Sequence, residues 1–219
     1  MKVTYEIENG KKVKVKTYVD GTVFKYDENG NMIYHKDNDG YECWKEYDAN
    51  GNKIHYKNRN GCEKWWDSNG NEIHYKNNDG NEYWYEYDSN GKMIHYKDSD
   101  GYEYWKEYDS NGKMIHLKDN KTYEEWIEYS YNGYKIHTKS IGGYEEWNEY
   151  DSNGNVTHYK NSDGYEKWYE FDANGRVIYF KNSDGYEEWR EYSYTGDIIR
   201  YKNNKGKEWF DYYKQSEAC

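Results

Sequence analysis

The chain alternates between short runs rich in aromatic, Ile and charged residues and short turn sequences that contain Gly. One representative stretch runs from Met93 to Lys97, turns at Asp98–Gly101 and continues from Tyr102 to Tyr108. Asn-Gly or Asp-Gly between two β-rich runs is the strongest short-range signal for a hairpin. No apolar stripe with a 3.6-residue period is present, and Tyr, Trp and Ile favour strands. The pattern therefore predicts antiparallel strands joined by tight turns.

The hairpin pattern repeats along almost the whole chain. A turn glycine recurs at spacings of 21, 19 and then 21 residues six times, and a second glycine follows each one after ten residues, except where Thr122 replaces it. The first series is Gly30, Gly51, Gly70, Gly91, Gly112, Gly133, Gly154, Gly175 and Gly196. We predict an all-β antiparallel meander of about nine tandem two-stranded hairpin repeats over residues 30–206. Residues 1–29 are predicted to form an N-terminal β cap and residues 207–219 a C-terminal cap or tail.

The number of strands also bears on the form of the sheet. Sheets twist, so a meander of this length is not expected to stay flat. Neither face is cleanly apolar, which argues against a two-sheet sandwich. We expect a single-layer sheet coiled into a superhelix or an open spiral.

The length of the repeat determines which side chains share a face. Because 21 is odd, we expect one turn of even length, a two-residue Asn-Gly turn, and one three-residue loop at the Asp-Ser-Asp-Gly end. One face then carries mostly aromatic side chains, in the sample repeat Ile94, Tyr96, Tyr102 and Tyr108. The other face carries His95, Lys97, Glu103, Trp105 and Glu107. Trp105 is predicted to lie opposite His95, and Lys97 opposite Glu103. The repeat ending at Gly70 lacks two residues, a change that preserves the faces.

Composition and charge narrow the class of protein. The chain has 31 Tyr, 10 Trp and 4 Phe but few aliphatic residues, so a core would have to be built from rings, each burying on the order of 150–250 Å². No apolar stretch at the start of the chain is as long as that of a signal peptide, and none approaches the roughly 18 apolar residues of a membrane span. Three cysteines without zinc-site spacing, Cys43, Cys62 and Cys219, favour a reducing, cytoplasmic setting. A net charge of −11 argues against binding nucleic acid or anionic membranes and is compatible with a basic protein partner.

The turn sequences carry a resemblance to a known repeat family. Tyr-Asp precedes the first glycine at Tyr47-Asp48, Tyr87-Asp88, Tyr108-Asp109 and Tyr150-Asp151, with Phe171-Asp172 as a near match. With its ten-plus-eleven glycine spacing, the region from about 24 to 206 resembles the YD repeats of RHS-type proteins, whose motif is Tyr-Asp-x-x-Gly-Arg. The motif is lost at Tyr129-Ser130 and Tyr192-Ser193, and the dense Trp and Glu positions resemble the MORN-2 group of hairpin repeats. RHS proteins use such repeats as a shell around a toxin domain, for which this chain is too short.

A second resemblance concerns the kind of protein. A compact, acidic chain of Tyr- and Trp-rich hairpins resembles the small phage-encoded inhibitors of type VI, RNA-targeting CRISPR effectors. The resemblance implies an inhibitor in the cytoplasm of a phage-infected bacterium, with the acidic surface on the basic RNA channel of a guide-loaded effector.

The polar residues that recur in the repeats are the candidates for catalysis or metal binding. Six histidines share one register: His55, His74, His95, His116, His137 and His158. Equivalent side chains in successive repeats are about 9–10 Å apart, whereas the ligands of one metal ion lie about 2 Å from it. We therefore expect each His to pair across strands with Trp and Glu. The Glu positions recur beside Lys in nearly every repeat, and the Asp-x-Asp-Gly turns lack the closing Glu of a calcium loop. No catalytic residue, metal or cofactor is predicted.

These observations predict a non-enzymatic protein that binds another protein through aromatic anchors and fixed charges. The predicted contact residues are Trp84, Glu86, Glu103, Trp105, Glu107, Glu124, Trp126, Glu145 and Trp147. No direct contact with nucleic acid or membrane is predicted. A carbohydrate- or wall-binding module, in which the same rings stack on sugars, and a purely structural shell repeat remain alternatives. In another interpretation, the Trp side chains form the core of the spiral.

Overall fold

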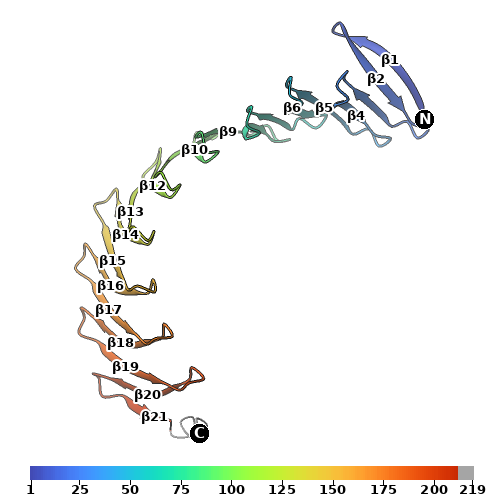
Figure 1. The fold of residues 1–219 in the computed structure, drawn as a ribbon. Helices are drawn as coiled ribbons and strands as arrows, with labels where there is room; N and C mark the ends of the chain where they lie inside the picture. The colour runs from blue at the N-terminus through green and yellow to red at the C-terminus, as the bar shows by residue number, and fades with distance from the viewer. Residues whose placement is uncertain (212–219) are drawn as a thin grey trace. The chain divides into compact units, whose positions relative to one another are not determined.

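The computed structural model describes residues 1–211, and every element in them is a β-strand (Figure 1). Contacts divide the chain into two units, Met1–Gly112 with Lys118–Lys121, and Lys113–Leu117 with Thr122–Cys219. The strands of the first unit are β1 (Lys2–Glu8), β2 (Lys11–Thr17), β3 (Val23–Tyr26), β4 (Met32–Lys36), β5 (Glu42–Tyr47), β6 (Lys53–Asn58), β7 (Glu63–Trp66), β8 (Glu72–Lys76), β9 (Glu82–Tyr87), β10 (Met93–Asp98) and β11 (Glu103–Tyr108).

The second unit continues the same series of strands. They are β13 (Glu124–Tyr129), β14 (Lys135–Ser140), β15 (Glu145–Tyr150), β16 (Val156–Asn161), β17 (Glu166–Phe171), β18 (Val177–Asn182), β19 (Glu187–Tyr192), β20 (Ile198–Asn203) and β21 (Glu208–Phe210). Strand β12 (Met114–Asp119) has residues in both units.

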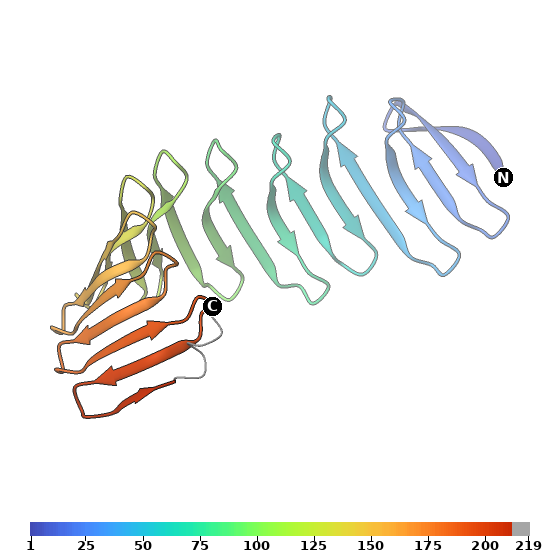
Figure 2. The ribbon, with the colours of Figure 1, turned by 60° about the horizontal axis from the view of Figure 1, so that its bottom comes forward.

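Each unit is an antiparallel meander. From β1 to β11, and from β13 to β21, each strand pairs with the next one in sequence. Figure 2 shows the hairpins following one another along the chain. Within residues 1–211, strands contact only their sequence neighbours, so each unit is a single layer that is not closed. The predicted all-β meander of hairpin repeats is confirmed. Its coiling stays a prediction, as do the boundaries of the caps, and residues 212–219 of the predicted tail lie outside the described residues.

Both turns of a repeat have the same geometry, which corrects the prediction of a two-residue Asn-Gly turn. At one end Gly91 N–H donates to the Asp88 carbonyl (3.0 Å) and Asp88 N–H to the Lys92 carbonyl (2.9 Å). The Asp98–Gly101 turn has the equivalent pair of bonds, and Gly91 and Gly101 have φ of 78° and 82°. Each is a three-residue loop closed by a glycine in the left-handed region. The Asp88 carboxylate accepts hydrogen bonds from the backbone of Asn90 (2.8 Å) and Lys92 (2.9 Å), which stabilises this longer loop.

A β-bulge accounts for the odd length of the repeat. Met93 pairs with Tyr87, but His95 pairs with Glu86, so Ile94 is an extra residue with no partner of its own on β9. A bulge shifts the side-chain alternation by one residue. His95 therefore lies on the face of Trp105, as predicted. Met93 lies on the tyrosine side, where the Tyr104 hydroxyl reaches its sulfur, and Ile94 has no cross-strand partner on β9 in the tyrosine row that the sequence predicted for it.

The bulge explains the Tyr-Asp pair of the repeat motif. The Tyr108 hydroxyl donates to the backbone carbonyl of Met93 at the bulge of the preceding hairpin (3.0 Å). The same bond, always to the residue fifteen positions earlier, is made by Tyr47, Tyr87, Tyr108, Tyr129, Tyr150 and Tyr192. The Tyr thus satisfies a carbonyl at the bulge, while the following Asp caps the turn.

Little of the chain is fully buried. The buried apolar residues are Val13, Val15, Cys43, Ile127 and Ile199. No aromatic residue is among them within the described part of the chain, so the expectation of a ring-built core is wrong. Because each unit is one layer thick, its rings cover the two surfaces of the sheet and stay partly open to water. Trp side chains accordingly do not form an enclosed core in either unit.

Candidate functional site

The Trp positions and their charged neighbours share one side of the sheet in each unit. We call this side the tryptophan face, defined by the positions that His95, Lys97, Glu103, Trp105 and Glu107 occupy in each repeat. His95 pairs with Trp105 and Lys97 with Glu103, which confirms both predicted pairings. The same two pairings recur in the second unit on β14–β15, β16–β17 and, with Tyr179 in place of His, on β18–β19.

The tryptophan face is organised in rows that cross the strands. Because of the bulge, cross-strand neighbours on this face follow one fixed order, Glu–His–Trp–Lys–Glu. In the second unit one row consists of Glu128, His137, Trp147, Lys160 and Glu166 on five successive strands. Each row contains one ring pair flanked by charged side chains, and the repeat of 21 residues produces the rows one after another.

In the second unit, His137 and His158 are each held by one Trp and two Glu. The rings of His137 and Trp147 are stacked, with centroids 5.1 Å apart and planes 8° apart. His137 Nε2 lies 2.9 Å from a Glu145 carboxylate oxygen, and Nδ1 lies 3.6 Å from Glu128. The hydrogen bond from His137 is the main cause that lowers the pKa of Glu145. The prediction that His pairs with Trp and Glu is confirmed, and these rings are structural parts of the face.

The shortened repeat changes this arrangement in the first unit. Because two residues are missing after Trp65, Trp65 pairs with His74 on the next strand rather than with Lys. Rings on four successive strands, His55, Trp65, His74 and Trp84, then stack continuously with centroids 4.9, 4.2 and 5.0 Å apart. The loss of two residues thus preserves the faces, as predicted, and joins two ring pairs into one stack.

Open hollows lie between successive ring pairs of the second unit. One hollow of about 500 Å³ is lined by Trp126, Glu128, His137, Lys139 and Glu145. The next, of about 400 Å³, is lined by the equivalent residues Trp147, Glu149, His158 and Lys160. A third, of about 240 Å³, is lined by Trp189, Glu191, Arg200 and Lys202. Each hollow presents one Trp ring beside one or two carboxylates and at least one Lys or Arg side chain.

The two classes of Glu on the tryptophan face differ in exposure. From Glu42 to Glu187, side chains equivalent to Glu103 are between 17% (Glu124) and 30% (Glu82) exposed and pair with His or Lys, whereas Glu208 in the last hairpin is 51% exposed. Those equivalent to Glu86 are between 56% (Glu191) and 74% (Glu149) exposed wherever they form an ion pair. Position in the repeat therefore separates structural carboxylates from carboxylates that a partner can reach.

The predicted contact residues fall into two groups, one in each unit. In the first unit Trp84 and Glu86 lie on β9, and Glu103, Trp105 and Glu107 lie on β11. There Lys97 pairs with both Trp84 and Glu103, and His95 pairs with both Glu86 and Trp105.

In the second unit the structure brings Trp126 and Glu145 to one hollow, with Glu124 on β13 and Trp147 on β15. The side chains of Trp105, Trp126 and Trp147 are 37–39% exposed. Sequence reasoning missed Glu128 and Glu149, although their spacing of two residues after Trp matches that of Glu86 and Glu107. Whether these residues bind a partner stays a prediction.

The described residues hold no cluster typical of a metal site. Within residues 1–211 no three His, Cys, Asp or Glu side chains are grouped as metal ligands would be. Among the same residues there is no helix long and apolar enough to cross a membrane.

The fold and the tryptophan face define a single-layer hairpin-repeat protein. The chain is similar to crystal structures of TcdB2-TccC3-Cdc42 (12% identity, TM-score 0.51) and of TcdB2-TccC3 (14% identity, TM-score 0.52). In both cases 95% of this chain is covered, and the chain spans 14% of the length of the matched chain. No family model and no curated protein matches the sequence. The likeness shows a shared fold and supports a YD-like hairpin repeat, and the comparisons give no support to a CRISPR inhibitor.

Proposed function

We propose that the protein acts without catalysis, by binding a basic surface of another protein through the tryptophan face. The observation that carries this proposal is the recurrence of exposed carboxylates, Glu86 in the first unit and Glu128 and Glu149 in the second, each beside a partly exposed Trp ring. Aromatic anchors next to charged groups are enriched in the contacts that dominate protein interfaces. The net charge of −11 adds long-range attraction to a basic partner.

The absence of catalysis rests on the regularity of the face. Half-buried carboxylates such as Glu145 and Glu166 are engaged by His and Lys in the same way from repeat to repeat. An acid–base pair needs two groups whose environments differ. The equivalent surroundings of these carboxylates favour a structural role for them.

The RNA channel of a guide-loaded type VI CRISPR effector, the partner predicted from the sequence, is one basic surface of this kind and is the first to be tested. Surface-immobilised protein should capture the effector at about 50 mM salt and release it as salt rises to about 500 mM, because exposed charges are screened. The variant Glu86→Gln/Glu128→Gln/Glu149→Gln should lower the association rate by about tenfold and change dissociation less.

A matched control removes three charges from the loops instead. Asp79, Asp100 and Asp163 are exposed loop residues, and their change to Asn subtracts the same net charge from the chain. If this control slows association as much as the Glu variant does, the face is not the contact surface. Capture of wall polymer, with competition by soluble sugar, would favour the carbohydrate-binding alternative. Binding that ignores salt would contradict the electrostatic part of the proposal.

A further inference from the structure

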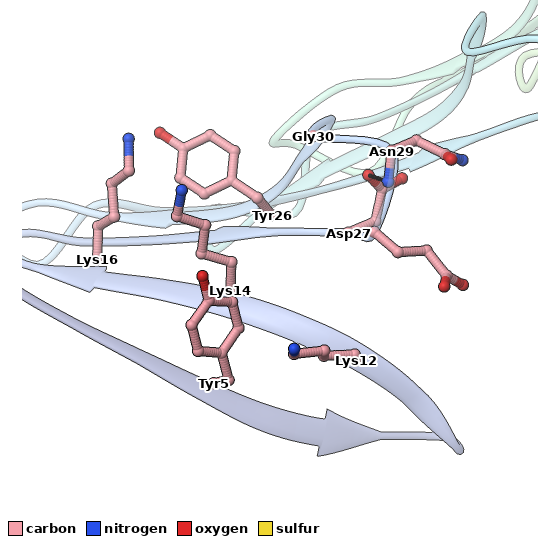
Figure 3. A pocket seen from close by; sticks show the side chains of 9 residues that line it. Tyr5, Lys12, Lys14, Lys16, Tyr26, Asp27, Asn29 and Gly30 are labelled. Carbon is pink, nitrogen blue, oxygen red and sulfur yellow. Dashed lines mark hydrogen bonds between the residues drawn. The ribbon is translucent and has the colours of Figure 1, made fainter.

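The N-terminal hairpin carries a basic hollow that the repeats do not share. It has a volume of about 540 Å³ and is lined by side chains of β1, β2 and β3 and by the turn that follows β3 (Figure 3). We call it the lysine pocket, defined by Tyr5, Lys12, Lys14, Lys16 and Tyr26, with the turn Asp27–Gly30 as one wall. Lys14 pairs with Tyr5 on β1 and with Tyr26 on β3, so it lies between the two rings.

The lysine pocket lies on the side of the sheet opposite the tryptophan face. Along the cross-strand pairs, Val15 is joined to Lys25, Lys25 to Tyr34 and Tyr34 to Trp44, so these side chains share the tryptophan face. Lys14 and Lys16 flank Val15 on β2 and therefore point to the other side. The pocket is thus separate from the residues of the proposed function.

The alternation of Lys and Val on β2 concentrates positive charge. Val13 and Val15 are only 3% and 5% exposed and fix the strand, which leaves Lys12, Lys14 and Lys16 side by side on the open face. Alternate residues of a strand are about 6.6–6.8 Å apart, close to the spacing of successive phosphates in an extended nucleic acid strand.

The acidic residues of the same hairpin are directed away from this cluster. Glu6 and Glu8 lie on the tryptophan face, where both pair with Lys25. In the described part of the chain no ion pair is found for Lys12, Lys14 or Lys16.

Two tyrosines supply aromatic surface next to the lysines. Lys12 Nζ lies 4.5 Å from the centroid of the Tyr5 ring, and Lys16 Nζ lies 4.9 Å from that of Tyr26. Tyr5 is 59% exposed, so its ring remains accessible to a planar ligand. A row of cations with flanking rings is the combination that proteins use for single-stranded nucleic acid.

The acidic wall of the pocket has one carboxylate held within the turn and one at its exposed tip. The Asp27 carboxylate accepts hydrogen bonds from the backbone of Asn29 (3.0 Å) and Asn31 (2.8 Å) and from the Asn31 side chain (3.0 Å). Glu28, at the exposed tip of the turn, opposes the lysines. Removing its charge should therefore strengthen the binding of an anion.

We propose that the lysine pocket binds single-stranded nucleic acid, with phosphates on Lys12, Lys14 and Lys16 and bases stacked on Tyr5 and Tyr26. This goes beyond the proposed function and does not depend on it. It also differs from the expectation drawn from the net charge, because charge summed over the chain conceals a local cluster of the opposite sign.

The test is fluorescence anisotropy of a labelled oligouridine strand with the full chain at low salt. Three phosphate contacts should give a slope of about −2 for log affinity against log salt. The variant Lys12→Gln/Lys14→Gln/Lys16→Gln should weaken binding by about tenfold or more through the lost phosphate contacts. As a matched control, Lys57→Gln/Lys97→Gln/Lys139→Gln removes three lysines from the tryptophan face, each about half exposed, and should leave the affinity within about twofold.

Variants of the rings and of the wall separate nucleic acid from a general anion. Tyr5→Leu and Tyr26→Leu should each weaken oligouridine binding by about fivefold or more, because stacking is lost, and should leave the binding of inorganic pyrophosphate unchanged. Glu28→Gln should tighten binding. Circular dichroism of every variant checks that the sheet is retained.

Three results would overturn the proposal. The first is the absence of oligouridine binding by the native chain at low salt. The second is binding that ignores both Tyr substitutions and is matched by polyaspartate, which would indicate a general polyanion surface. The third is self-association that depends on the three lysines, seen by sedimentation, which would indicate that the acidic surface of a second copy fills the pocket.

Discussion

Tyr108 and Phe171 occupy equivalent positions in two repeats and differ by the hydroxyl that reaches the bulge carbonyl. Changing Tyr108 to Phe leaves the Met93 carbonyl without this donor and should lower the free energy of unfolding by about 1 kcal/mol. The reverse change, Phe171→Tyr, should add the bond to the Val156 carbonyl and raise stability by a similar amount. Urea denaturation followed by circular dichroism measures both. Equal effects of the same sign would contradict the assigned role of the hydroxyl.

Two adjacent glycines in one turn allow a second comparison. Gly143 has φ of +80°, the left-handed region that L residues avoid, whereas Gly142 has an ordinary φ, and neither has an atom that an added Cβ would meet. Gly143→Ala should therefore cost about 1–2 kcal/mol, and Gly142→Ala should be neutral or raise stability by about 0.4–1 kcal/mol through the unfolded chain. The melting temperatures of the two variants test this prediction. A Gly143→Ala variant as stable as the native chain would contradict the need for glycine at the closing position of the turn.

At the residue scale, the sequence predicted the positions of the turns but not their type. The recurring Gly after Asn or Asp marks each loop correctly. The Asn-Gly dipeptide suggested a two-residue turn, because that rule considers only the two central residues. The Asp two positions before the Asn, as in Asp88, caps the backbone of a longer loop, so a side-chain hydrogen bond decided the turn type.

Among strands and hairpins, the shortened repeat provides a natural experiment. Deleting Asn148 and Glu149 would copy the Trp65-Trp66 arrangement in the second unit, keep the faces and bring Trp147 opposite His158. We expect this two-residue deletion to fold with a melting temperature close to that of the native chain. Deleting Asn148 alone should invert the end of the strand and destabilise the unit by about 3 kcal/mol or more.

Calorimetry of the two deletions checks this prediction. The near-ultraviolet circular dichroism should also gain intensity in the double deletion, since His137, Trp147, His158 and Trp168 would form one stack. Equal destabilisation by one and by two residues would show that the faces are not what the strand requires.

The pairing of strands was predictable, whereas the bulge was not. His95 opposite Trp105 and Lys97 opposite Glu103 follow from counting residues outward from the Asp-Gly turn. The extra residue is Ile94, Ile136 or Thr157 in different repeats, all β-branched residues that look like ordinary strand positions. In the sequence, only the odd repeat length indicated that each repeat holds one residue beyond regular strand alternation. This extra residue was predicted to lie in a turn rather than in a bulge.

For the molecule as a whole, the partly covered rings make stability sensitive to alkali. Burial raises the pKa of Tyr96 from 10.0 to about 12, and burial is also the main cause of the raised pKa of Tyr85, Tyr104 and Tyr108. Because the fold favours the neutral phenol, this contribution to stability is complete below pH 10 and is lost as the pH rises through about 12. Absorbance at about 295 nm, which follows phenol ionisation, should therefore change together with the loss of sheet signal.

Unfolding well below pH 10 would contradict this account. A Tyr96→Phe variant serves as the control, since it removes one such phenol and should unfold at a slightly higher pH.

The candidate site was only partly visible at this scale from sequence. The recurrence of Trp and Glu located the tryptophan face, because alternation along a strand follows from residue number alone. The sequence did not predict the difference in exposure between Glu103 and Glu86. That difference depends on which carboxylate lies within reach of His and Lys on the neighbouring strand. The lysine pocket was hidden by the net charge of the chain.

The pairing of each strand with its sequence neighbours also affects how the chain acquires its structure. Among the described pairs, partners such as Lys2 and Thr17 or Asn161 and Glu146 are no more than fifteen positions apart. A protein with such low contact order closes only short loops and folds quickly for its size. Once a hairpin and the next strand of a nascent chain have emerged from the ribosome, all three strands can already form their pairings with one another. Folding can therefore keep pace with translation.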